Sequence, residues 1–194
     1  RDHCVTGVQT CALPILLRAA GVRCEGRSPD VDESRILDPD PVRLAHLRAA
    51  AKAAAVVVPD AIVIGADQVA HLGPEVFGKP KDPLDHGVRL RQLRGQTHTL
   101  TTAVAIAHAG AVRTLACQTR LRFRADVSDA EIDAYVATGE GSGCAGGYAA
   151  EGLGAQLIEQ IDGDFFNVLG LPLLDVLGAL RALGWRPDFR ETRP

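Results

Sequence analysis

The sequence predicts an α/β protein in which helices cover a mixed β-sheet. The run 60–69 is apolar and rich in β-branched residues, as is typical of a buried strand. The segments 97–108 and 112–123 alternate in polarity around Ala109-Gly110, which predicts a hairpin. Between these runs lie helix-start signals followed by helix-ending glycines. Strands and helices that alternate in this way indicate a sheet with helices packed on it.

The remaining elements follow from local signals. Asp40-Pro41 predicts a helix start, because an Asp side chain caps and proline suits the first helical position. Ser128 begins a capping box with Glu131, which predicts another helix. The other expected elements are a helix ending at Gly21, a strand over 22–26, a polar loop over 28–34, a helix from Asp82-Pro83 to Gly95, a strand over 157–161 and a helix over 173–183.

Composition narrows the function classes. At 194 residues and 46% apolar content, one domain with a real core is expected, with two small lobes as the alternative. The net charge of −3 and the lack of a basic tract argue against nucleic acid as a partner. No apolar run reaches about 18 residues, so no membrane partner is expected. The five cysteines form no C-x-x-C pair, which favours a reducing, cytoplasmic setting over a zinc or disulfide framework.

The first fifteen residues differ from the rest of the sequence in their pattern. Residues 5–15 look like the translation of a common sequencing adapter, and they show neither helical nor strand periodicity. We therefore expect 1–15 to be an artefactual segment, a single domain over 16–186 and a loose tail over 187–194. The chain contains no Met, which fits the expectation that the authentic start is missing.

Asp67 is the first candidate for chemistry. The pattern places it at the tip of the 60–69 strand, and strand ends in α/β sheets are where ligands usually bind. If Gly73-Pro74 folds the chain back, Lys79 returns near Asp67. A carboxylate facing a lysine suits a phosphate and metal site. The alternative is a surface salt bridge at a sheet edge.

Two further candidates stand elsewhere in the chain. Lys52 is the only charge in 49–59, so it either snorkels from an alanine-rich surface or points into the crevice of Asp67. The loop acids Asp30, Asp32 and Glu33 are either solvated or able to hold a divalent cation through oxygen ligands.

Seven motifs together resemble the Maf family of nucleoside triphosphate pyrophosphatases. The resemblance covers Leu16 to about Gly184. Its motifs are Val31-Asp32-Glu33, Lys52-Ala53, Ile64-Gly65-Ala66-Asp67-Gln68-Val69, Gly78-Lys79-Pro80, Thr97-His98-Thr99-Leu100-Thr101-Thr102, Cys144-Ala145-Gly146-Gly147-Tyr148 and Asn167-Val168-Leu169-Gly170-Leu171-Pro172-Leu173. Each motif alone is weak, and their shared order and spacing carry the resemblance.

The resemblance implies a fold, a reaction and residue roles. The fold is a twisted mixed sheet with flanking helices and a central cleft, similar to inosine-triphosphate pyrophosphatases. The reaction cleaves a nucleoside triphosphate into the monophosphate and pyrophosphate with a divalent metal, Mg or Mn. Asp67 is implied as the base that activates water and, with Glu33, as a metal ligand. Lys52 and Lys79 are implied as phosphate contacts, and a homodimer is expected.

The nucleotide is suggested by two residues. Gln68 follows Asp67 as in the branch of the family that acts on 7-methyl-GTP, and Glu151 points the same way. A carboxylate can accept from N1–H and the exocyclic amine of guanine and complements the charge of N7 methylation. The alternatives are a dTTP/UTP pyrophosphatase, a non-catalytic nucleotide-binding regulator of cell division, and Glu151 as a solvated loop acid.

The chain departs from the family at its beginning. Family members start with a strand and a Ser-rich, Arg-Arg phosphate-binding turn, and the adapter-like segment stands in their place here. We therefore expect one central strand and the phosphate arginines to be absent, and this chain to fold poorly or turn over slowly.

Overall fold

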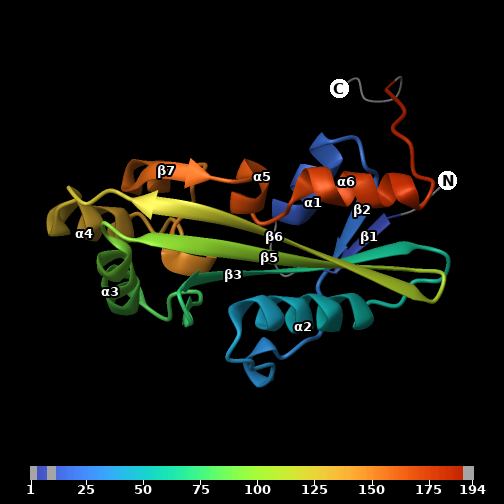
Figure 1. Cartoon of the computed structure of the whole chain (residues 1–194), viewed down its shortest axis with the longest axis horizontal. Helices are drawn as coiled ribbons and strands as arrows, with labels where there is room; N and C mark the ends of the chain where they lie inside the picture. The colour runs from blue at the N-terminus through green and yellow to red at the C-terminus, as the bar shows by residue number, and fades with distance from the viewer. Residues whose placement is uncertain (1–3, 8–11, 190–194) are drawn as a thin grey trace.

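The computed structural model describes residues 4–7 and 12–189, which form an elongated molecule along a long twisted sheet (Figure 1). The strands are β1 (Cys4–Gly7), β2 (Cys24–Arg27), β3 (Ile62–Leu72), β4 (Glu75–Phe77), β5 (Thr97–His108), β6 (Ala111–Phe123) and β7 (Ile158–Asp162). The α-helices are α1 (Ala12–Ala19), α2 (Pro41–Ala54), α3 (Pro83–Leu93), α4 (Asp129–Ala137), α5 (Phe165–Val168) and α6 (Leu173–Ala182). Three short 3₁₀ turns are η1 (Glu33–Arg35), η2 (Ala145–Gly147) and η3 (Leu153–Leu157).

The sheet is mixed, which confirms the predicted fold class. Its strand order is β2-β1-β3-β5-β6-β7, and β4 pairs with β3 off this path. β1 runs parallel to both β2 and β3, whereas β3, β5, β6 and β7 pair antiparallel. The long β3, β5 and β6 therefore form the spine on which the helices pack.

The expected absence of a central strand is wrong. β1 lies between β2 and β3, and Thr6 pairs with Gly26 on one side and with Ile64 on the other. A four-residue central strand is too short to show periodicity, so its pairing is invisible in the sequence. Residues 8–11, where the phosphate-binding turn was expected to be missing, lie outside the described residues.

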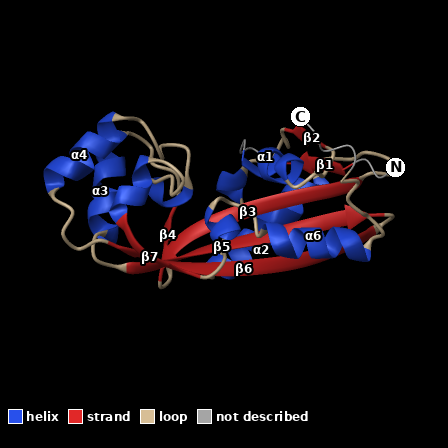
Figure 2. Cartoon of the chain, turned by 90° about the horizontal axis from the view of Figure 1, so that it is seen from above, coloured by secondary structure: helices blue, strands red, loops and turns tan. Residues whose placement is uncertain are grey.

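Helices cover both faces of the spine. α1 and α6 share one apolar core with the face of β3 that carries Ile62 and Ile64. α2 packs on the opposite face, against Val69 of β3. A third core joins α3 and α4 to the other end of the sheet, so these helices form a lobe of their own (Figure 2).

Gly65 explains how closely α2 approaches the sheet. A Cβ built on Gly65 would lie 2.4 Å from the backbone N of Ala53 and 2.5 Å from the carbonyl O of Ala49. Only glycine leaves room for a helix backbone at this distance, and the alanine-rich sequence of α2 keeps the interface thin. As a result, side chains of α2 reach the residues next to Gly65.

The local signals are confirmed at most element ends. Asp40 caps α2 by accepting from the backbone N–H of Val42, and the Ser128–Glu131 capping box opens α4. Ala109 and Gly110 have positive φ, as a tight hairpin between β5 and β6 requires. No helix within the described ranges is long and apolar enough to cross a membrane.

Candidate active site

Asp67 lies in the middle of β3, and its predicted place at a strand tip is wrong. The strand continues to Leu72, and Asp67 pairs with Ala103 of β5. Gly65-Ala66 suggested a turn, but Gly65 instead makes room for α2 on a continuous strand. The side chain points to the α2 face and is only 7% exposed, which excludes a surface salt bridge at a sheet edge.

Lys52 and Glu33 meet Asp67 on this face. Nζ of Lys52 donates to Oδ1 of Asp67 at 2.6 Å and lies 2.9 Å from Oε1 of Glu33. The contact between Lys52 and Glu33 is an ion pair by distance, but its geometry is not that of a hydrogen bond. Lys52 is 4% exposed, so it does not snorkel to the surface, and its side chain points at Asp67. One ammonium thus lies between two carboxylates.

Burial dominates the electrostatics of Asp67. Loss of solvent raises the pKa of Asp67, and the negative charge of Glu33 raises it further. The charges of Lys52 and Arg48 oppose both effects. Oδ2 of Asp67 is buried and has no hydrogen-bond partner among the residues that the structure describes. A carboxylate with a raised pKa and a free acceptor oxygen has the properties of a general base.

Arg48 was not singled out by the sequence analysis. It lies one helical turn before Lys52 on α2, and its Nη2 donates to the carbonyls of Glu33 and Ile36, both at 3.4 Å. The i, i+4 spacing from Lys52 was the available signal, because such residues share one helix face.

Lys79 and Glu151 act on Cys144 rather than on Asp67. Lys79 follows the β3–β4 hairpin as expected, but it makes no ion pair with Asp67 among the residues described. Both side chains are exposed. The pKa of Cys144 is raised mainly by burial and then by the charge of Glu151, and it is lowered by the charge of Lys79. The two charges therefore act on the loop that carries Cys144.

Gln68 points away from Asp67, because successive strand residues face opposite sides of a sheet. Its Nε2 donates to the carbonyl O of Asn167 at 2.6 Å and to Oγ1 of Thr102 at 3.0 Å. Asn167 in turn donates to the carbonyl O of Leu100 and to Oγ1 of Thr119. The side-chain amide of Gln68 is thus engaged within the fold.

The carboxylates of Asp67 and Glu33 are suitable ligands for a magnesium-like ion. In the described part of the chain, Oδ2 of Asp67 is a buried acceptor without a partner, and the carboxylate of Glu33 reaches the same ammonium group as Asp67. Mg²⁺ usually binds through one or two carboxylates together with substrate phosphates. Across residues 4–7 and 12–189, no group of three or more His, Cys, Asp or Glu side chains could hold a metal by itself.

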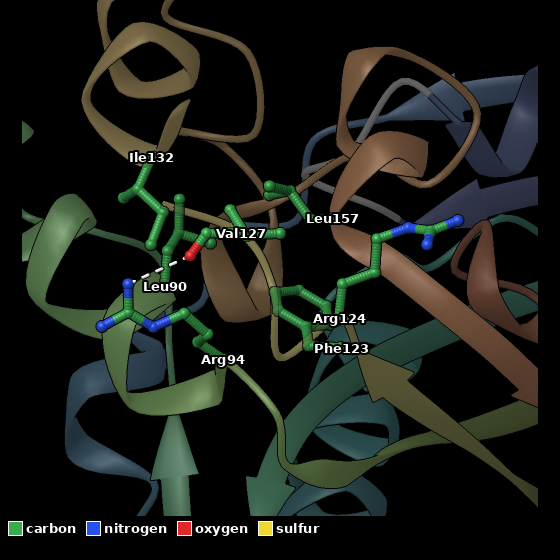
Figure 3. A pocket seen from close by; sticks show the side chains of 7 residues that line it. All are labelled: Leu90, Arg94, Phe123, Arg124, Val127, Ile132 and Leu157. Carbon is green, nitrogen blue, oxygen red and sulfur yellow. Dashed lines mark hydrogen bonds between the residues drawn. The ribbon is translucent and has the colours of Figure 1, made fainter. Parts of the chain in front are cut away.

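One pocket is lined by residues that are far in the sequence from Lys52, Asp67 and Glu33. It is lined by Leu90, Arg94, Phe123, Arg124, Val127, Ile132 and Leu157 (Figure 3). Nη1 of Arg94 closes it by donating to the carbonyl O of Val127 at 3.1 Å. Its five apolar lining residues all belong to the core of the α3–α4 lobe, so the pocket is a gap in that core.

The fold and the buried cluster define a mixed α/β protein with an acid–lysine site on one face of its sheet. The chain belongs to the Maf family: it matches that family, described as Maf-like protein, over residues 15–183. A nucleoside triphosphate pyrophosphatase of Synechococcus sp. (strain JA-3-3Ab) is 41% identical over 93% of this chain and 94% of its own length. A dTTP/UTP pyrophosphatase of Thermus thermophilus is 40% identical over 89% of this chain and 90% of its own. A nucleoside triphosphate pyrophosphatase of Bradyrhizobium diazoefficiens is 37% identical, over 90% of each chain.

These relatives confirm the expected family and the expectation of an enzyme, a hydrolase of the pyrophosphatase class. The 7-methyl-GTP branch, the roles of the site residues and the central cleft stay predictions.

Proposed function

We propose that this chain hydrolyses a nucleoside triphosphate to its monophosphate and pyrophosphate, with Asp67 as the general base. The observation that carries the proposal is the buried Asp67 carboxylate, which Lys52 holds at Oδ1 and whose Oδ2 has no partner within residues 4–7 and 12–189. Oδ1 fixes the orientation of the group, and Oδ2 can take a proton from an attacking water. Burial raises the pKa of Asp67, which makes the carboxylate a better base.

The cations of the site serve the leaving group. A triphosphate and the departing pyrophosphate carry several negative charges, which Lys52 can offset from within the site and Lys79 from its exposed position. Asp67 and Glu33 would hold a divalent cation, Mg or Mn, which would lower the pKa of a bound water and screen phosphate charge. Glu33 also keeps Lys52 in place through the 2.9 Å ion pair.

For the nucleotide, we propose 7-methyl-GTP or a similar modified nucleotide. Glu151 is exposed in a loop whose backbone is well anchored: Glu140 accepts from the N–H groups of Leu153 and Gly154 at 3.0 and 2.8 Å. An anchored, accessible carboxylate can accept from the donor edge of guanine and favour the positive charge of the methylated ring. Gln68 supports this branch by resemblance, although its amide faces Asn167.

The second candidate is dTTP or UTP, and a specific observation favours it. Several similar proteins are named dTTP/UTP pyrophosphatases, among them the Thermus thermophilus protein and one of Deinococcus radiodurans at 37% identity. Thymine and uracil have a single ring N–H donor, so they would use Glu151 less fully than guanine does.

The experiment is a panel of nucleoside triphosphates with pyrophosphate release as the readout. The proposal expects the highest kcat/KM for 7-methyl-GTP and a fall of about 10²–10⁴-fold for Asp67→Asn. Asp175→Asn, an exposed acid of α6, is the matched control and is expected to leave turnover unchanged. A preference for dTTP or UTP would assign the second candidate. Binding of nucleotide without turnover would instead support a regulator.

A further inference from the structure

The turn that carries Glu33 depends on α2 for its position. η1 has no buried residue, and its internal contacts are local: Asp32 accepts from Ser34 N, and Ile36 N donates to Glu33 O. The polar segment before it contributes no strand or helix. Apart from partly buried Ile36, which packs against the α2 core, the turn has few apolar contacts.

Arg48 clamps this turn at two points. Its Nη2 donates to the carbonyl of Glu33, inside η1, and to the carbonyl of Ile36, which ends the turn. Its Nε is buried, so the guanidinium is inserted beneath the turn rather than extended into solvent. Both contacts come from one nitrogen, Nη2, whose two N–H groups lie in the guanidinium plane and can each donate to one carbonyl.

We propose that Arg48 is a positioning residue that holds the Glu33 turn on α2, so that the Glu33 carboxylate stays on Lys52. Arg48 and Lys52 stand one helical turn apart and hold the same residue at its two ends. Arg48 contacts the backbone of Glu33, and Lys52 contacts its carboxylate. Lys52 meets both carboxylates, Asp67 Oδ1 at 2.6 Å and Glu33 Oε1 at 2.9 Å, whereas the contacts of Arg48 are with backbone carbonyls of the turn. The catalytic consequence rests on the function proposed above.

Hydrogen exchange tests the positioning without any substrate. Arg48→Leu keeps the bulk and helix propensity of the side chain but removes the donors. The amides of 34–36 are expected to exchange about tenfold faster in this variant. The control is Arg43→Leu on the same helix, whose arginine pairs with Asp38 at 3.1 Å and is largely exposed. Equal protection of 34–36 in both variants would overturn the proposal.

A double-mutant cycle tests the consequence for turnover. Arg48→Leu is expected to lower kcat about tenfold, with KM within about twofold. If Arg48 acts through Glu33, Arg48→Leu combined with Glu33→Gln is no slower than Glu33→Gln alone. Multiplied losses in the double variant would overturn this pathway, because a general structural defect adds to the loss of Glu33.

Arg48→Lys separates charge from geometry. Its ammonium keeps the charge but not the planar fork, so less than half of the lost turnover is expected to return. Full recovery would overturn positioning as the role. If Asp67→Asn retains turnover, the proposed function fails, whereas the hydrogen-exchange comparison still decides the role of Arg48.

Discussion

At the residue scale, the cluster of Lys52, Asp67 and Glu33 places two carboxylates and one ammonium at a nearly buried site. Two carboxylates share one ammonium, and Lys52 and Asp67 are almost without solvent. Such a pair has a large desolvation cost, so it is weak evidence for net stabilisation. Removing one partner is a different matter, because the other charge is then left buried and alone.

Lys52→Met therefore is expected to destabilise the fold by about 3–5 kcal/mol. The apolar stem keeps its packing, but Asp67 and Glu33 lose their cation. The measurement is the free energy of unfolding in urea. Combining Lys52→Met with Asp67→Asn should recover part of this loss, because the unpaired charge is gone. A double variant with the summed losses of the two single variants would contradict the coupling.

His98 is a buried titratable group outside this cluster. It is 1% exposed on β5, its Nε2 is hydrogen-bonded to the Tyr148 hydroxyl at 2.6 Å, and its ring meets Phe123 edge to face. Burial, and then the charge of His71, lowers the pKa of His98 from 6.5 to about 4. The neutral ring is therefore the form that fits the fold.

This shift predicts an acid-linked loss of stability. Because the folded pKa lies below the unfolded value, the unfolded chain takes up the proton first as pH falls below 6.5. The contribution of His98 to stability should fall by about 1.4 kcal/mol per pH unit between 6.5 and 4, or roughly 3–4 kcal/mol in all. Urea unfolding from pH 7 to pH 4 measures it. His98→Gln should lack this component, whereas His46→Gln on α2 should keep it, and parallel curves for all three proteins would refute the assignment.

At the element scale, the contact between α2 and β3 decides where the site forms. Gly65 permits the close approach, and Lys52 reaches Asp67 two residues further along the strand. The same two elements carry Arg48 and Lys52, which contact Glu33, and Asp67, which shares Lys52 with it. Moving the helix outward would therefore separate the whole cluster.

Gly65→Ala is expected to cost about 1–3 kcal/mol, because its Cβ would overlap the α2 backbone, which cannot rotate away. The site would open at the same time, so pyrophosphate release should fall with stability. Gly178→Ala in α6 is the matched control. A Cβ there meets nothing within 4 Å, and alanine favours a helix, so a gain of up to about 1 kcal/mol is expected. A Gly65→Ala variant as stable as the parent would show that α2 can move away from β3 at little cost in free energy.

At the scale of the whole molecule, β1 connects parts that are distant in the sequence. It pairs with β2 on one side and β3 on the other, so β1 joins β2 to the long strands of the sheet. The core under α1 and α6 includes Cys24 of β2 and Ile64 of β3. Four residues that lie before the family match at 15–183 thus complete one side of the fold.

Thr6→Pro is expected to lower Tm strongly, because proline removes a ladder donor and is not tolerated in a central strand. Val57→Pro is the control: Val57 is 84% exposed in the connection between α2 and β3. Circular dichroism during heating compares the two. Equal Tm values for Thr6→Pro and the parent would show that β1 adds nothing, as the adapter-like reading of 1–15 expects.

Much of the architecture followed from local signals. Asp40, Ser128 and the Ala109-Gly110 turn gave correct element ends, because caps and tight turns depend on a few neighbouring residues. The short α5 was missed, since four residues carry too little periodicity. β1 was missed for the same reason, and its pairing with β2 and β3 is what identifies it as a strand.

The sequence by itself determined the alternation of strands and helices, the family resemblance and the candidate acids and lysines. Only the tertiary structure decided that Lys52, rather than Lys79, contacts Asp67, that Gln68 faces the other side of the sheet, and that Arg48 belongs to the site. The physical reason is distance along the chain: these contacts arise where α2 docks on β3, and no local pattern encodes how closely two separate elements approach.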